Sequence, residues 1–91
     1  MFFVGAVGLQ YRILPEGVEV DLDTLLTGVK AVLPKGAALK ASEKKPLAFG
    51  LSALHVLIVM EDKQGGAEEL EQAIAGVSGV QSVEIVEMGL L

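Results

Sequence analysis

Apolar and polar positions along the chain fall into six blocks, which predict four strands and two helices. Two of the predicted strands are almost continuously apolar, as in strands covered on both sides. The other two mix apolar with charged or polar residues, which is typical of the edges of a sheet. The predicted strands are residues 2–13, 37–45, 50–61 and 80–88, and the predicted helices follow Asp21 and start near Ala67.

The helices are predicted from apolar residues at helical spacing, Leu22 to Leu33 in the first and Leu70 to Val77 in the second. Asp21 is expected to cap the first helix, because its carboxylate can accept a free backbone N–H of the first turn. The resulting order is β-α-β-β-α-β, the split βαβ or ferredoxin-like arrangement. We expect an α+β sandwich of one domain, residues 1–91, with both helices on one face of a four-stranded antiparallel sheet.

The order of strands in the sheet follows from how apolar each strand is. The first and third strands are the most apolar and are expected in the centre, while the second and fourth are expected at the edges. This is the order 4-1-3-2, which is compatible with right-handed crossovers.

The charge of the chain is negative and unevenly placed. The formal net charge is −5, and residues 64–91 contain acids but no Lys or Arg. Such a chain repels phosphate backbones, so we expect no direct nucleic-acid partner. A basic surface on another protein is the better match.

No membrane-spanning segment is predicted. The apolar stretch Leu51–Met60 is far shorter than the roughly 20 residues needed to cross a bilayer. The apolar start Met1–Leu9 is interpreted as a strand, with a signal peptide as the weaker alternative. A cytoplasmic protein is expected.

The residues available for catalysis or metal binding are few. The chain has one His, one Arg and one Tyr, and no Cys, Asn or Trp. His55 lies among aliphatic residues and is interpreted as a tolerated residue on the helix-free face of the sheet. We therefore expect no enzyme activity, no metal site and no cofactor.

The segment Pro46-Leu47-Ala48-Phe49-Gly50 lies between two predicted strands and fits neither. Pro46 cannot join a regular ladder and Gly50 permits unusual backbone angles. Residue chemistry alone favours Phe49 as a core residue that caps the sheet. The alternative is an aromatic anchor presented to a partner protein.

This segment also resembles a known family. Lys45–Leu54 is similar to the Pro-Ile-Ala-Phe-Gly-Leu-x-Ala-Leu signature of archaeal elongation factor 1-beta, which in turn resembles the exchange domain of the eukaryotic beta subunit. Leu14–Leu22, Glu61–Gly66 and Gly79–Glu84 resemble further segments of that family. The resemblance covers nearly the whole chain in register.

The resemblance implies a translation elongation factor that promotes exchange of GDP for GTP on elongation factor 1-alpha by protein contact. It implies that the Phe49 loop inserts into the nucleotide-binding domain of the partner, and that the last strand ends near the Mg²⁺ and phosphates. The partner-binding residues expected on this basis are Pro46, Leu47, Ala48, Phe49, Gly50, Gln81, Ser82, Met88 and Leu90. A monomer is expected, with a homodimer as the alternative.

One position departs from the family pattern. Eukaryotic members have a lysine next to the C-terminal residue, where the resemblance implies that it disturbs the Mg²⁺ site. Leu90 occupies this position here. A cationic displacement of Mg²⁺ by this tail is therefore not expected.

A second class of function stays open on the sequence. A ferredoxin-like regulatory module could bind a small ligand or self-associate through its open sheet face, where Leu57 and Val59 are apolar.

Overall fold

The computed structural model describes residues 6–34, 36–61 and 66–90. The strands are β1 (Ala6–Pro15), β2 (Ala38–Pro46), β3 (Ser52–Glu61) and β4 (Val80–Leu90), and the helices are α1 (Leu22–Val32) and α2 (Gly66–Ala75). All six predicted elements are present, in the predicted order. The predicted start of the first strand at residue 2, and most of the loop at 62–66, lie outside the described residues.

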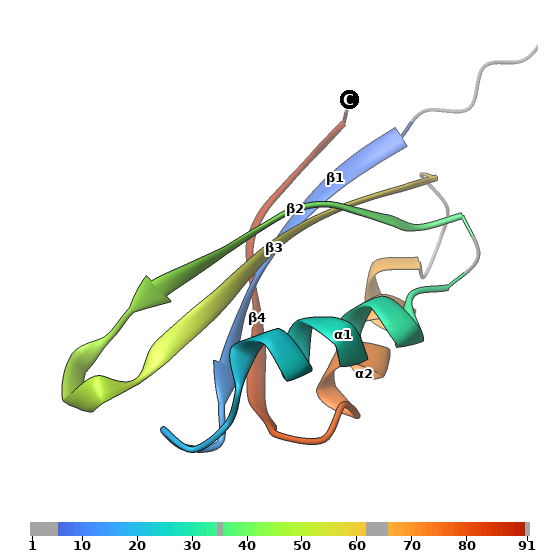
Figure 1. Ribbon diagram of the computed structural model, residues 1–91. Helices are drawn as coiled ribbons and strands as arrows, with labels where there is room; N and C mark the ends of the chain where they lie inside the picture. Colours follow the sequence, from blue (N-terminus) through green and yellow to red (C-terminus); the bar gives the residue numbers. More distant parts are fainter. Residues whose placement is uncertain (1–5, 35, 62–65, 91) are drawn as a thin grey trace, which may run out of the picture.

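The four strands form one sheet in the order β2-β3-β1-β4, in which every neighbouring pair is antiparallel. This confirms the predicted order, with the two most apolar strands in the centre. Both helices lie on the same side of the sheet (Figure 1).

The core lies between this side of the sheet and the helices. Alternate residues of β1 and β3 point toward the helices and are almost fully buried, since side chains alternate between the faces of a strand. The main core residues are Leu9, Tyr11, Ile13, Leu54, Val56 and Ile58 from the sheet, and Leu25, Val29, Leu70 and Ile74 from the helices. Neither helix in the described part of the chain is long and apolar enough to cross a membrane.

The start of α1 is fixed by Asp21, as predicted. Its Oδ1 accepts the backbone N–H of Asp23 at 3.0 Å, and its Oδ2 accepts the Thr24 hydroxyl at 3.3 Å. One backbone donor of the first turn, which has no partner within the helix, is thereby satisfied. The cap also sets where the β1–α1 loop ends.

The helix-free face of the sheet has a polar row that crosses all four strands. The strand register places Glu43 opposite His55, His55 opposite Arg12, and Arg12 opposite Glu84. Arg12 and Glu84 form an ion pair across the β1–β4 boundary. The predicted position of His55 on this face is confirmed, and its side chain is half-buried.

The β4 strand runs to Leu90 and is two residues longer than predicted. Its pairing with β1 shifts register between Gln10, opposite Glu87, and Tyr11, opposite Ile85, so that Val86 is the extra residue of a bulge. Ile85, Val86 and Met88 are all exposed.

The β2–β3 hairpin extends beyond the region that the helices cover (Figure 1). Every residue from 41 to 50 is exposed, whereas the β3 residues Leu54 and Val56 are buried. The hairpin therefore begins in the core and ends in solvent.

Candidate partner-binding site

The hairpin ends in a tight turn, and we call residues 46–52 the hairpin tip. Pro46 and Ser52 are the last strand pair. Beyond them, the Leu47 N–H donates to the Leu51 carbonyl at 2.6 Å, and the Leu51 N–H donates to the Ala48 carbonyl at 3.3 Å. These bonds close a four-residue turn, Ala48 to Leu51, with Phe49 and Gly50 at its corners.

Both corner residues of this turn have a positive φ, 61° at Phe49 and 77° at Gly50. A turn of type I′ requires this conformation at both positions, and Asn-Gly is the usual pair there. Glycine adopts it freely, but a phenylalanine is strained by about 1–2 kcal/mol because its Cβ crowds the following carbonyl oxygen. Phe49 is the one non-glycine residue with positive φ among the described residues.

The strained turn presents the Phe49 ring to solvent, where 95% of the residue is exposed. The expectation from residue chemistry, that Phe49 caps the core, is wrong: the hairpin tip lies beyond the helices, and no core is within reach. Strained backbone at an exposed position is a recognised sign of a functional site. Covering this ring would gain about 1.5–3 kcal/mol from the hydrophobic effect.

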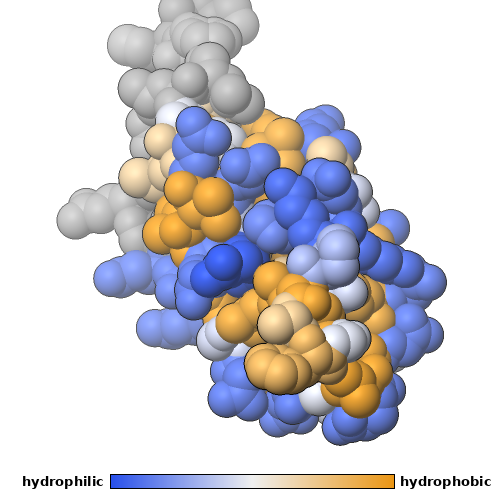
Figure 2. Space-filling model, turned by 90° about the vertical axis from the view of Figure 1, so that its left-hand side faces the viewer, coloured by the Kyte–Doolittle hydropathy of each residue, from blue (hydrophilic) through white to orange (hydrophobic). Residues whose placement is uncertain are grey.

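The other residues expected at the hairpin end lie around Phe49. Leu47 is 39% exposed, and Pro46 and Ala48 are exposed as well. In Figure 2, which faces this end of the molecule, an apolar patch in the lower half is bordered by hydrophilic surface. The predicted segment 46–50 is thus continuous and exposed along its whole length.

The expected residues on β4 are divided between two places. Gln81 and Ser82 lie at the start of the strand, where Ser82 is opposite Leu14. Met88 lies near its end, opposite Leu9, which is itself opposite Ile58. Phe49 comes nine residues before Ile58, which is about 30 Å along a strand. The structure therefore does not bring the end of β4 to the hairpin tip.

Of Leu90, only the backbone is described: it is the last residue of β4 and pairs with Val7.

The β1–α1 loop also lies at the hairpin end of the molecule, and the sequence did not predict it as part of the site. Val18 in this loop is 64% exposed, more than any other large apolar residue of the described ranges except Phe49. Its Cγ1 atom lies 3.8 Å from the position of a Cβ built on Gly50. The signal that could have found it is a β-branched residue between Gly17 and Glu19, where neither strand nor helix periodicity explains an apolar side chain.

Burial and neighbouring charges shift the pKa of three described groups, one of them at this end of the molecule. Lys44 is tied to Asp23 by an ion pair of 2.7 Å, and this hydrogen bond raises the pKa of Lys44. On the helix-free face, burial together with Lys45 and Arg12 lowers the pKa of His55. In the core, burial and the charge of Glu71 raise the pKa of Tyr11 to about 12.

These groups form no converging set of acids, bases or nucleophiles of the kind that catalysis needs. In residues 6–34, 36–61 and 66–90, no group of three His, Asp or Glu side chains is placed to hold a metal ion. What the hairpin end offers is exposed apolar surface on fixed turns, which is suited to protein contact.

Comparison with known proteins connects this structure to one family. The profile of the EF-1 guanine nucleotide exchange domain matches residues 9–91. Elongation factor 1-beta of Methanococcoides burtonii is 46% identical over 86 residues, which cover 94% of this chain and 97% of that protein. Elongation factor 1-beta of Haloarcula marismortui is 40% identical over 88 residues, covering 97% and 100%.

Among solved structures, the chain is similar to the ACT domain from a GTP pyrophosphokinase of Chlorobium tepidum. The TM-score is 0.60 with 16% sequence identity, over 87% of this chain and 96% of that one. At this identity the similarity concerns the fold, and it agrees with the ferredoxin-like arrangement.

Proposed function

The chain belongs to the EF-1 guanine nucleotide exchange domain family, and we propose that it promotes release of GDP from elongation factor 1-alpha by protein contact alone. The observation that carries this proposal is the hairpin tip, where a strained turn holds Phe49 95% exposed. The factor acts in the cytoplasm and as a monomer. It uses no cofactor and makes no covalent bond.

Exchange follows from a difference in binding. The factor binds the nucleotide-free GTPase more tightly than the GDP-bound form, and linkage then requires GDP to bind more weakly when the factor is present. A tenfold weakening of GDP binding to the GTPase needs about 1.4 kcal/mol of coupling free energy. Burial of one phenylalanine ring supplies energy of this size.

The hairpin tip carries most of this coupling. Phe49 inserts into the partner, while Leu47 lies beside it, and Pro46 and Gly50 shape the turn. Gln81, Ser82, Met88 and Leu90 form a second contact along β4. Because Leu90 cannot supply a positive charge near Mg²⁺, the contribution of this second contact is the smaller one.

The self-association alternative draws less support from the described residues. Leu57 and Val59 on the helix-free face are half-buried, and the polar row of Glu43, His55 and Arg12 crosses the same face. A stable dimer through this face would have to cover that row. The hairpin end presents larger and more exposed apolar side chains.

Release of fluorescently labelled GDP from elongation factor 1-alpha tests the proposal directly. The wild-type chain is expected to accelerate release, and Phe49→Ala is expected to lose most of this effect while keeping the wild-type circular dichroism. Val86→Ala is the matched control, since Val86 is also an exposed apolar residue, 53% accessible, and belongs to neither proposed contact. Equal acceleration by wild type and Phe49→Ala would contradict the role of Phe49.

A further inference from the structure

The β1–α1 loop holds Val18 in a second tight turn at the hairpin end. The Val20 N–H donates to the Gly17 carbonyl at 3.2 Å, so Val18 and Glu19 are the corners of this turn. The loop is also tied to the start of β4, because the Glu16 N–H donates to the Gly79 carbonyl at 2.9 Å. Val18 is therefore exposed on a fixed segment, as Phe49 is.

An open cavity of about 250 Å³ lies between the two turns. Its wall comes from the β1–α1 loop on one side and from the hairpin on the other, with Gly50 next to Val18. The lining residues are Pro15, Gly17, Val18, Val20, Asp21, Leu22, Lys44, Gly50 and Ser52. Apolar side chains and glycines share this wall with Asp21, Lys44 and Ser52, so the cavity offers a partner side chain both apolar contact and polar groups.

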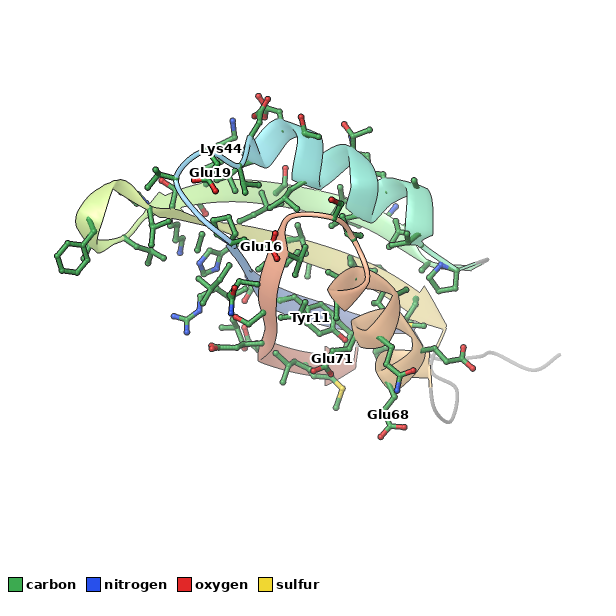
Figure 3. All side chains as sticks on the ribbon, turned by 90° about the horizontal axis from the view of Figure 1, so that it is seen from below. Tyr11, Glu16, Glu19, Lys44, Glu68 and Glu71 are labelled. Atoms are coloured by element: carbon green, nitrogen blue, oxygen red, sulfur yellow. The ribbon has the colours of Figure 1, made fainter. Side chains whose placement is uncertain are left out.

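The rim of the cavity is acidic. Asp21 lines the cavity, the Glu19 carboxylate lies over Gly17 of its wall, and Glu16 is exposed in the same loop. Figure 3 shows Glu16 and Glu19 in the same half of the molecule as Lys44. Lys44 is already neutralised by Asp23. Within the described part of the chain, Glu16 and Glu19 form no ion pair. The charge that complements this rim is positive.

We propose that Val18 and this cavity form the second half of the docking surface whose first half is Phe49, and that they receive an apolar side chain flanked by Lys or Arg on the GTPase. The proposal rests on the proposed function and names the part of the partner that fits. The occupant is one segment of the GTPase, whose apolar side chain enters the cavity while its cations face Glu16 and Glu19.

Geometry links the two halves. Val18 contacts the position of Gly50, the neighbour of Phe49 in the same turn. A protein surface that packs on the hairpin tip from the side of Gly50 therefore also reaches Val18. In well-packed interfaces such neighbours exclude water from the central anchor, and an unfilled cavity beside the hairpin tip would weaken the contact.

The first test measures binding of the full chain to nucleotide-free elongation factor 1-alpha by titration calorimetry. Val18→Asp is expected to weaken binding at least tenfold, and Val18→Ser several-fold, without lowering the melting temperature because Val18 is exposed. Val86→Ser is the matched control, since Val86 is an exposed valine on β4, and it is expected to bind within twofold of wild type.

The outcomes separate this inference from the proposed function. If wild type does not bind the GTPase at all, the proposed function is wrong. If wild type binds, Phe49→Ala loses binding and both Val18 variants bind like wild type, the proposed function stands and the second half of the docking surface is wrong.

A second measurement tests the chemistry of the partner segment. Binding is repeated between 50 and about 300 mM salt with wild type and with Glu16→Gln/Glu19→Gln, because salt screens exposed charge pairs over about 10 Å. The double variant is expected to bind several-fold more weakly at low salt and to depend less on salt. An unchanged salt dependence would show that the partner segment is not basic.

Discussion

Two exposed apolar regions of this small protein differ in how the backbone holds them. At the hairpin end, Phe49 and Val18 each occupy the corner of a hydrogen-bonded turn, and the turn of Phe49 is strained. Along the outer half of β4, Ile85, Val86 and Met88 lie on a bulged edge strand. Fixed turns lose little entropy when a partner covers them, whereas an edge strand offers a broad surface without a defined anchor. From this comparison we expect binding energy to be concentrated at the hairpin end.

The largest effect is expected from Phe49→Asn, which separates binding from stability. Loss of the ring should cost about 2 kcal/mol or more at the interface, or roughly 30-fold in affinity. Asparagine tolerates positive φ, so the free energy of unfolding should rise by about 1 kcal/mol. Urea denaturation and GDP-release kinetics measure the two effects. A less stable Phe49→Asn would refute the account of strain.

A smaller effect is expected at the cap that positions the β1–α1 loop. Asp21→Ala removes the acceptor of the Asp23 N–H and should lower the free energy of unfolding by about 1 kcal/mol. Thr24→Ala is a suitable control, because its hydroxyl donates to the same carboxylate at 3.3 Å but caps no backbone group. If the two variants unfold at the same urea concentration, the backbone cap does not stabilise α1.

Deletion of Met88–Leu91 tests the other side of the comparison. It removes the exposed Met88 but leaves the hairpin end intact, so exchange is expected to slow only about threefold, or roughly 0.7 kcal/mol. The measurement is the same labelled-GDP assay, at equal concentrations of folded protein. Complete loss of exchange would place the main contact on β4 and reverse the comparison.

The smallest effect concerns the polar row that connects the two edges of the sheet. His55 faces Glu43, Arg12 and Lys45 there, and its pKa is lowered from the ordinary 6.5 by burial and by the two cations. His55 is therefore protonated at a higher pH in the unfolded chain than in the native state. As the pH falls through 6.5, the free energy of unfolding decreases. In His55→Gln, urea denaturation should show a smaller loss of unfolding free energy between pH 7 and pH 5.5. An unchanged pH dependence would show that His55 is not the source of this loss.

Hydrophobic periodicity predicted the fold because the apolar content of each strand reflects how deeply that strand is buried. The apolar β1 and β3 had to be central, and the charged β2 could only be an edge. Asp21 was predictable for a similar reason, since capping depends on the adjacent turn. Contact with β1 sets the end of β4, and the sequence of β4 alone placed it two residues too early.

The candidate site was harder to predict, because the exposure of Phe49 depends on where the helices end relative to the hairpin. Phe49 is apolar and lies between a proline and a glycine, which is compatible with a core position as well as with an exposed turn. Only the family resemblance favoured exposure. Val18 could not be placed next to Gly50 from the sequence, since 32 positions separate them and their proximity arises from the packing of two loops.

The hairpin has one more consequence, for how such a protein can change over time. Residues 41–50 are all exposed, and the core is built from other residues. A substitution in the core can alter stability without reshaping the segment that meets the partner, and a substitution at the tip can alter recognition without unfolding the domain. Folding and recognition can thus be varied separately.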